Sequence, residues 1–491
     1  MSTINKDKSG LEIKTKTQED IKEDFFKYLT EQGRKENTVR QYITKIPELQ
    51  KWFIENNIIG TDYNIWTDKD KIGDINARLN NDSKKLWMAT NKQIKHWFSA
   101  PWRAWTTFNG NKPLADIIDE NEIFDYKSFY QSAQEAKLIF SEELIIRFSA
   151  SILTKPFVVL TGLSGSGKTK LAQAFAMWIC EDDNQYCIIP VGADWTNREP
   201  LLGFPNALEK EKYVKPDNGV LDLIIAADAD QEKPYFLILD EMNLSHVERY
   251  FADFLSVMES GGKISLHPGQ SWDGIPSQIT LPKNLFIIGT VNIDETTYMF
   301  SPKVLDRANV IEFRVTADEM GKYLSSATSL DLEKLNAAGA NMAGSFVEIA
   351  SNKSMPVENV AKLKNELLIF FTELKKIGTE FGFRSASEIM RFAAIVNTIE
   401  PAWKDKRIID AAIMQKLLPK VHGSRRKLEP VLKTLGTLCL AAGQNIDEFI
   451  NIKTEIDFND TAKIKYPISF EKILRMYRGL MDNGFTSYAE A

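Results

Sequence analysis

The chain has 491 residues, of which 43% are hydrophobic and 26% are charged, and its formal net charge is −6. This composition is ordinary for globular proteins and excludes a collagen-like, largely disordered or membrane-embedded chain, while the length predicts roughly two to four domains. Three cysteines, four histidines and no apolar run near the ~20 residues of a membrane span predict a cytoplasmic protein without disulfides, a zinc site or membrane contact.

The first part of the chain is predicted to be a polar, flexible tail, residues 1–18, and a small, mostly helical domain, residues 19–113. Residues 1–113 contain 20 Lys and Arg against 15 Asp and Glu, a net charge of +5. The remaining 378 residues contain 41 against 52, a net charge of −11. Six of the ten tryptophans also lie in the first part, so the chain combines regions of different character.

Positive charge beside aromatic rings favours DNA binding by residues 19–113. Lysine and arginine offset phosphate charge, and rings stack on unpaired or flipped bases. Lys92, Lys95 and Arg103 are the candidate phosphate contacts. A protein-partner domain and a purely structural domain are the alternatives, because tryptophans at this density also build the cores of small domains.

Residues 114–139 are acidic and are predicted to be a linker, and residues 140–316 then alternate strands with helices. That alternation indicates a large α/β subdomain with a parallel sheet and crossover helices. Glycine and proline residues in Gly261–Trp272 predict a hairpin-like insert. Four apolar runs predict buried strands: Pro156–Thr161, Cys187–Val191, Tyr235–Leu239 and Leu285–Thr290.

The remainder of the chain is predicted to be helical, with a lid subdomain over residues 317–450 and a C-terminal helical tail over residues 451–491. Apolar residues at helical spacing support the lid. The segments that show this spacing are Val360–Ile377, Ala386–Thr398, Ile408–Leu418 and Leu428–Ala442.

The strongest motif is a phosphate-binding loop, G-x-x-x-x-G-K-T, which follows an apolar strand and precedes a helix. Its glycines let backbone N–H groups turn toward a β-phosphate at the positive end of that helix. Lys168 is predicted to reach the β- and γ-phosphates, and the Thr169 hydroxyl to bind Mg²⁺. The predicted nucleotide contacts are Gly162, Leu163, Ser164, Gly165, Ser166, Gly167, Lys168, Thr169 and Lys170.

Two later strands end in polar residues that suit the same chemistry. Asp240 and Glu241 follow the run that begins at Tyr235, which predicts Asp240 as a Mg²⁺ ligand and Glu241 as the general base for water. Asn292 ends the next run and is predicted to orient that water beside the γ-phosphate.

This ordered set resembles the AAA+ superfamily of P-loop NTPases, and more closely its McrB-type branch, the motor subunits of modified-cytosine (type IV) restriction systems. The resemblance covers about residues 140–440 and does not cover residues 1–113. It implies an α/β core with a helical lid. The stretches that carry it are Leu160–Leu171, Asp194–Gly203, Leu239–Ser245, Phe300–Ala308, Phe381–Glu388 and Leu418–Arg426.

The resemblance also implies roles for two arginines. Arg307 is the candidate arginine finger for a neighbouring subunit, with Arg249 as the alternative and a surface ion pair as the other interpretation of either residue. Arg384 is similar to a sensor-two arginine that contacts the nucleotide from the lid, and an ion pair with Glu388 is its alternative.

The sequence departs from the family after the sensor Asn292. GTP-using members carry Asn-Thr-Ala-Asp-Arg, whereas Glu295 and Thr296 stand at the last two positions here. The sequence therefore leaves GTP and ATP both open as substrates.

The function that the resemblance implies is a homo-oligomeric, hexamer-like, Mg²⁺-dependent NTPase ring that recognises DNA, modified or unmodified, and activates a separate McrC-like nuclease subunit. No nuclease motif stands out in the sequence, which is consistent with a separate subunit. A protein-remodelling ATPase of the MoxR or dynein-related kind, and a nucleotide switch without motor activity, are the alternatives.

Overall fold

The computed structural model describes residues 4–6, 12–14, 18–31, isolated positions between 40 and 64, residues 123–293, 298, 300–325, 329–451, 456–489 and 491. Helix α1 (Gln18–Glu31) opens the region that was predicted to be mostly helical. Strands β1 (Ile4–Lys6) and β2 (Glu12–Lys14) pair antiparallel before it. The candidate DNA contacts lie outside the described residues; they are Lys92, Lys95 and Arg103.

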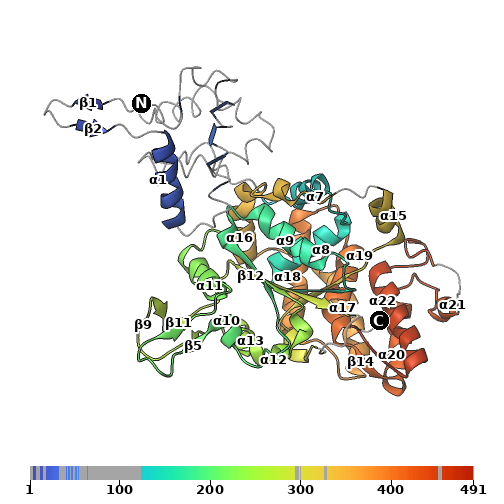
Figure 1. Cartoon of the computed structure of the whole chain (residues 1–491). Helices are drawn as coiled ribbons and strands as arrows, with labels where there is room; N and C mark the ends of the chain where they lie inside the picture. Colours follow the sequence, from blue (N-terminus) through green and yellow to red (C-terminus); the bar gives the residue numbers. More distant parts are fainter. Residues whose placement is uncertain are drawn as a thin grey trace.

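Five parallel strands form the sheet at the centre of the molecule (Figure 1). Their order across the sheet is β13–β3–β12–β7–β4, so the first strand in the chain lies between the fifth and the fourth. All four predicted runs are strands, whereas β13 was not predicted because Asn309 and Glu312 interrupt its apolar pattern. The five strands are β3 (Phe157–Gly162), β4 (Tyr186–Pro190), β7 (Tyr235–Asp240), β12 (Leu285–Asn292) and β13 (Asn309–Phe313).

Helices cover both faces of this sheet. In Figure 1 the helices α7, α8, α9 and α16 lie on its upper side, α12 and α13 lie on its lower side, and α11 lies to its left. Phe175 of α9 packs edge-on against Phe236 of β7, and Phe251 packs against Phe157 of β3. The bounds are α7 (Tyr126–Glu135), α8 (Glu142–Thr154), α9 (Lys168–Ile179), α11 (Val220–Ala229), α12 (Val247–Tyr250), α13 (Ala252–Ser260) and α16 (Ala343–Ser351).

Two boundaries of the predicted subdomains differ from the structure. The predicted linker 114–139 is wrong from residue 123 onward, because Phe129 of α7 is buried against Phe175 and Asp125 caps α7 instead of lying in an acidic connector. The predicted lid begins too early, since Phe346 of α16 packs on the aromatic side chains of the sheet.

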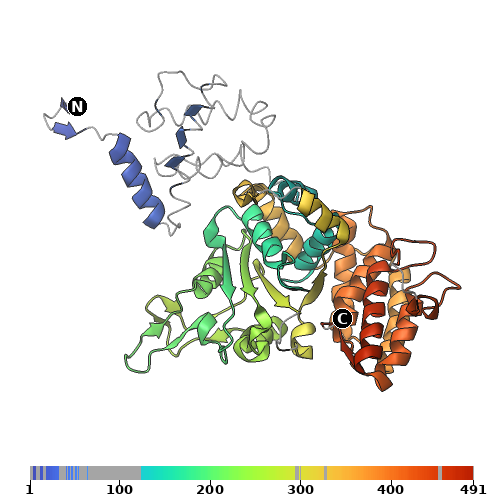
Figure 2. The same ribbon diagram turned by 45° about the vertical axis from the view of Figure 1, so that its right-hand side comes forward.

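The lid forms a helical bundle beside the sheet, as Figure 2 shows. The four predicted lid helices are confirmed. A further helix, α22 (Pro467–Asn483), packs against α20, and β15 (Phe485–Ser487) pairs with β14 (His422–Ser424), so these elements of the predicted C-terminal helical tail belong to this bundle. The other lid helices are α17 (Val360–Lys375), α18 (Phe383–Ile399), α19 (Asp405–Ala412), the π-helix η6 (Ile413–Leu417) and α20 (Arg425–Leu438).

Buried polar contacts join α22 to the rest of the lid. The carboxylate of Asp410 on α19 accepts hydrogen bonds from the backbone N–H groups of Ile468 and Ser469 in the first turn of α22. Burial raises the pKa of Asp410 to about 6. In the described part of the chain, no helix combines the length and the apolar character that a membrane span requires.

The predicted insert is confirmed as two short antiparallel ladders. Strand β8 (Ile264–Ser265) pairs with β11 (Gln278–Ile279), and β9 (Ser271–Trp272) pairs with β10 (Ile275–Pro276). His267 is buried there and stacks on Trp272. The remaining short elements are α10 (Glu199–Leu202), β5 (Phe204–Pro205), β6 (Tyr213–Val214), α14 (Pro302–Leu305), α15 (Ala317–Ser325) and α21 (Asp447–Ile450).

Candidate nucleotide site

The phosphate-binding loop joins the end of β3 to the start of α9. Gly162 has φ +154°, and a Cβ there would lie 2.3 Å from the carbonyl oxygen of Phe313, so only glycine fits. Lys168 is 4% exposed, and its Nζ donates to the carbonyl oxygens of Gly162 and Leu163 at 2.9 and 2.6 Å. The loop therefore folds around its own lysine, beside the N–H groups that open α9.

The parallel register brings the second group of predicted residues to the same edge of the sheet. Thr169 Oγ1 donates to Asp240 Oδ1 at 2.6 Å, and Thr290 Oγ1 donates to the same oxygen at 2.7 Å. The backbone N–H of Glu241 donates to Thr290 Oγ1 at 3.0 Å. Thr290 was not predicted, although a threonine two residues before Asn292 points to the same face of the strand.

Glu241 and Asn292 are in direct contact. Asn292 Nδ2 donates to Glu241 Oε1 at 3.0 Å, and Asn292 is 7% exposed. Glu241 has φ +54°, in the left-handed region that a glutamate adopts at a cost of roughly 1–3 kcal/mol. Strain of this kind persists when neighbouring contacts hold it, and it aims the carboxylate at the end of the sheet.

The side-chain oxygen atoms at this edge of the sheet suit a magnesium ion as ligands. Thr169 and Asp240 offer a hydroxyl and a carboxylate within hydrogen-bond distance of each other, next to the loop that cradles phosphates. Mg²⁺ in such sites takes one or two protein oxygens together with phosphate oxygens and water. Over the described ranges, no three or more His, Cys, Asp or Glu residues form a cluster that could hold a metal. A P-loop site does not need such a cluster, because phosphate oxygens and water supply the other ligands of Mg²⁺.

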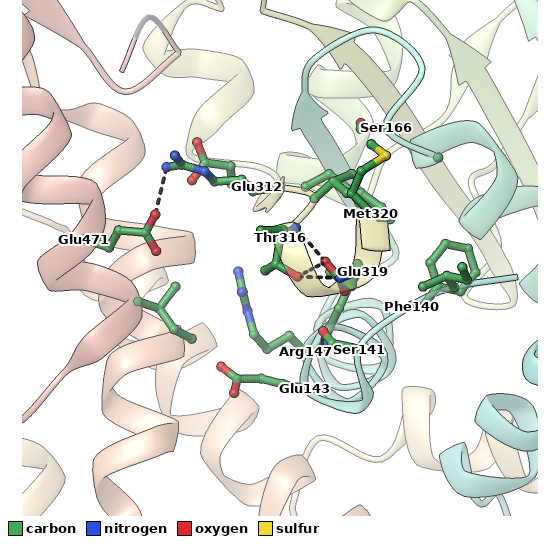
Figure 3. A pocket seen from close by; sticks show the side chains of 18 of the residues that line it. Phe140, Ser141, Glu143, Arg147, Ser166, Glu312, Thr316, Glu319, Met320 and Glu471 are labelled. Carbon is green, nitrogen blue, oxygen red and sulfur yellow. Dashed lines mark hydrogen bonds and ion pairs between the residues drawn. The ribbon is translucent and has the colours of Figure 1, made fainter. Parts of the chain in front are cut away.

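A cavity of about 1310 Å³ opens beside the phosphate-binding loop, between the α/β core and the lid (Figure 3). It runs from Gly165–Gly167 along α8 to α22. Phe140 and Phe313 lie against Gly167, and their rings meet edge to face at 6.0 Å. The remaining wall includes Leu144, Arg147, Thr316, Met320, Ile468 and Arg475.

The two predicted functional arginines lie together but not at this loop. Arg307 is buried; its Nε donates to the carbonyl oxygen of Leu255 at 2.8 Å, and its Nη2 pairs with Glu259. Arg384 pairs with the other carboxylate oxygen of Glu259. Burial and the neighbouring charge of Arg384 lower the pKa of Arg307.

The alternative ion pair predicted for Arg384 is wrong. Glu388 pairs with Lys155 and Lys416 instead, because it lies one helical turn further along α18 and faces the core. Arg249 is exposed on α12. Residues 294–297, which include the altered sensor signature, lie outside the described residues.

Comparisons with known proteins give limited matches. A domain of unknown function (DUF8727) matches residues 331–485, from before α16 to β15. None of the curated proteins matches the chain. A crystal structure of a candidate ATPase from Cytophaga hutchinsonii ATCC 33406 is similar at 13% identity and a TM-score of 0.42, over 60% of this chain and 86% of that chain. A full-length MCM homolog from Methanopyrus kandleri is similar at 11% identity and a TM-score of 0.33, over 60% of this chain and 58% of that chain.

The fold class follows from the sheet itself. A phosphate-binding loop follows the first parallel strand, an Asp-Glu pair the third and an asparagine the fourth, with a helical lid beside the sheet. The predicted α/β class, a parallel sheet with flanking helices and a phosphate-binding loop beside a helical lid, is thereby confirmed.

Proposed function

We propose that the protein is a Mg²⁺-dependent nucleoside triphosphate hydrolase. The observation that carries the proposal is the continuous set of hydrogen bonds from Thr169 through Asp240 and Thr290 to Glu241 and Asn292. These groups meet at the one edge of the sheet where the loop can hold phosphates. A site with these parts suits a phosphate chain.

The roles of the residues follow from their chemistry. Lys168 would exchange its bonds to the loop carbonyls for bonds to the β- and γ-phosphates. Glu241 would accept a proton from the attacking water, and Asn292 would hold the Glu241 carboxylate in place. Mg²⁺, held by Thr169 and Asp240, would offset the negative charge of the phosphate oxygens when bound.

We further propose that the protein acts as a ring in which Arg307 serves the neighbouring subunit. Residue 307 precedes β13, whose first residue pairs with Val158 near the start of β3, whereas the phosphate-binding loop follows the end of β3. From Val158 to the end of β3 the strand advances by four residues, which corresponds to about 13 Å at the usual rise per residue. The Arg307 guanidinium, fixed to α13 at the far end, thus faces away from the site of its own chain.

Within such a ring, the finer proposal is a McrBC-type restriction motor that recognises DNA and activates a separate nuclease subunit. It is supported by the sequence resemblance in the core and by the basic, tryptophan-rich first part. The test is phosphate release with GTP and ATP side by side, with Lys168→Ala as the inactive control, followed by addition of DNA and of a nuclease subunit.

The outcomes separate the candidate functions. Turnover that DNA stimulates supports the restriction motor. Turnover that ignores DNA but rises with a protein partner supports a remodelling ATPase of the MoxR or dynein-related kind. A Glu241→Gln variant that still activates the partner supports a nucleotide switch, since a motor needs turnover. A monomer in sedimentation with every nucleotide contradicts the ring.

A further inference from the structure

The backbone on both sides of Arg307 is held by two lysines that share one carboxylate. Lys416 Nζ donates to the carbonyl oxygen of the next residue, Ala308, at 2.8 Å. Lys155 Nζ donates to the carbonyl oxygen of the residue before Arg307 at 3.3 Å. Both lysines pair with the carboxylate of Glu388. The two carbonyl groups that flank Arg307 are therefore connected through a single acid.

Most of these contacts come from the lid. Lys416 lies on η6 and Glu388 on α18, whereas Lys155 follows the end of α8 in the core. A third lysine of the lid, Lys420, pairs with the carboxylate of Asp306. The side chains of Lys416 and Glu388 are only 4% and 14% exposed, and ion pairs buried in this way are costly to break. The lid therefore fixes the residues on both sides of the arginine.

The segment that carries Lys416 has an uncommon helical geometry. It is the π-helix η6, which continues α19 and leads into the 3₁₀-helix η7 (Leu418–Lys420). Gln415, one residue earlier, donates to Ser151 Oγ on α8 at 2.8 Å and accepts from Arg147 Nε at 3.0 Å. π-helical turns are rare and frequently lie at functional sites. Here the turn directs two consecutive polar side chains to two parts of the core, α8 and the residue before β13.

The side chain of Arg307 takes its own partners from the core. Its Nη1 donates to the carbonyl oxygen of Lys303 at 2.7 Å, and its Nε and Nη2 bind Leu255 and Glu259. An arginine that completes the site of a neighbouring subunit must be placed to within about 0.5 Å, since an error of about 1 Å can cost roughly a hundredfold in rate. The lid contacts at the backbone and the core contacts at the side chain together fix that placement.

We propose that Lys416 and Glu388 are positioning residues for Arg307, which hold its backbone and thereby set where its guanidinium stands for the neighbouring subunit. The inference rests on the proposed function, in which Arg307 acts on the nucleotide of a neighbour. It makes the lid of the chain that supplies the arginine a control on hydrolysis in the next chain. Lys416 and Glu388 do not contact the nucleotide in this scheme, so their loss lowers turnover and leaves nucleotide binding unchanged.

The first experiment measures kcat and KM for phosphate release by the full chain, as wild type and as Lys416→Met. Methionine has a similar length and no charge, and the variant leaves Glu388 paired with Lys155. We expect kcat to fall by roughly ten- to a hundredfold, while KM and nucleotide affinity stay within about twofold of wild type. Glu388→Gln, which removes the shared charge, should give the same split between kcat and KM.

Asp410→Ala is the matched control for a merely structural effect. Asp410 is another buried polar residue of the lid, and its carboxylate bonds go to the first turn of α22 instead of the segment that carries Arg307. This variant should lower the melting temperature, because two backbone N–H groups lose their acceptor. It should leave kcat within about twofold of wild type.

A double-mutant cycle tests whether the effect of Lys416 passes through Arg307. Once Arg307→Ala has removed the arginine, Lys416→Met should cause no further loss of turnover. Single-turnover phosphate release gives the rates of these slow variants. Two losses that multiply would mean that Lys416 acts independently of Arg307, and would overturn the positioning role.

A mixing assay tests whether the effect reaches the neighbouring chain. Glu241→Gln chains keep a correctly held Arg307, and Lys416→Met chains keep their acids. An equal mixture should therefore release phosphate faster than the mean of the two separate variants. A rate equal to that mean, from chains shown to assemble together, would place the effect of Lys416 within its own chain and overturn the proposal.

Other outcomes distinguish the positioning role from the proposed function. An unchanged kcat in Lys416→Met, beside a loss in Arg307→Ala, would overturn the positioning role and leave the hydrolase and its arginine intact. Full activity of Arg307→Ala would overturn the role as well, because the effect passes through that residue. Absence of turnover in wild type with GTP and with ATP, with and without DNA, would instead overturn the proposed function, and the positioning role with it.

Discussion

The two ends of the core sheet hold polar clusters of opposite kind. At the end of β3, Thr169, Asp240, Glu241 and Asn292 form a connected set of acids and donors around a phosphate-binding loop. At the other end, Arg307 and Arg384 share the single carboxylate of Glu259. The first cluster gathers groups that suit a phosphate chain and a metal ion, whereas the second has more positive than negative charge.

This difference indicates how the proposed catalytic residues are divided between the two ends of the sheet. The acids that we propose hold magnesium and activate water, Asp240 and Glu241, both stand at the end of β7, beside Asn292 of the adjacent strand β12, so one chain can position them. The arginines that would neutralise the charge developing on a phosphoryl group lie at the far end, so a neighbouring chain must present them. Substitutions at the two ends should therefore have different effects on nucleotide binding and turnover.

The largest effect is expected for Lys168→Ala. The lysine is the cation nearest the predicted phosphates, and its loss should reduce nucleotide binding by at least about a hundredfold and make turnover undetectable. Isothermal titration with GTP and ATP measures this. Lys233→Ala, an ion-paired lysine away from the loop, should bind normally. Normal binding by Lys168→Ala would contradict the site.

Glu241→Gln should lower turnover by roughly 10²–10⁴-fold, the usual contribution of a general base, while nucleotide affinity stays within a few fold of wild type. Asn292→Ala should also lower turnover while leaving nucleotide affinity nearly unchanged. The loss of turnover should be smaller, because the variant frees the Glu241 carboxylate without removing it. Single-turnover phosphate release, measured beside equilibrium binding, separates the two quantities. Loss of affinity in both variants would argue for a structural role.

Arg307→Ala should lower turnover by about a hundredfold or more, with nucleotide binding to the isolated chain unchanged. Its bonds to Leu255 and Glu259 also anchor α14 to α13, so circular dichroism and thermal melting must accompany the assay. Arg249→Ala, at the exposed alternative position, is the comparison variant. Full activity of Arg307→Ala together with loss of activity in Arg249→Ala would indicate that Arg249 on α12 is the arginine finger.

The smallest effect concerns the lid contact at the arginine end. Burial lowers the pKa of Lys416 to about 8, despite its pair with Glu388. Unfolded lysine titrates near 10.4, so between about pH 8 and 10.4 the unfolded chain binds more protons than the folded chain. The free energy of unfolding should therefore rise with pH in this window, by at most about 1.4 kcal/mol per pH unit from this group.

Urea unfolding of wild type and Lys416→Met at pH 8 and pH 10 tests this. The stability difference should move in favour of wild type at the higher pH, because the methionine variant cannot lose a proton. Lys362→Met, on an exposed lid pair, should show no such change. A shift in the opposite direction would mean that the folded state stabilises charged Lys416.

The sequence predicted the parts of the molecule that strong local patterns specify. Long apolar runs gave β3, β4, β7 and β12, and the loop motif located Lys168 and Thr169. The strand β13 was missed because Glu312 breaks its apolar run, and its charge is offset by Lys472 and Arg475, which are 160 and 163 residues away. Such compensation depends on tertiary contacts and leaves no local signal.

The same limit explains the errors around the arginines. The alternative interpretation of Arg384 paired it with Glu388, but the fold brings Glu259 to Arg384 from 125 residues away. Acidic composition suggested a linker up to residue 139, yet aromatic residues beside the acids pack α7 into the core. Composition averages over residues that face different ways, so it could not distinguish an acidic linker from a helix that packs into the core.

The measurement that tests the division of the site most directly is a mixing assay. Glu241→Gln chains keep their arginines, and Arg307→Ala chains keep their acids, and each is expected to be nearly inactive alone. If Arg307 acts on a neighbour, mixing the two in equal amounts should restore phosphate release well above the mean of the separate variants. A mixture no more active than that mean, from chains shown to assemble together, would contradict the account.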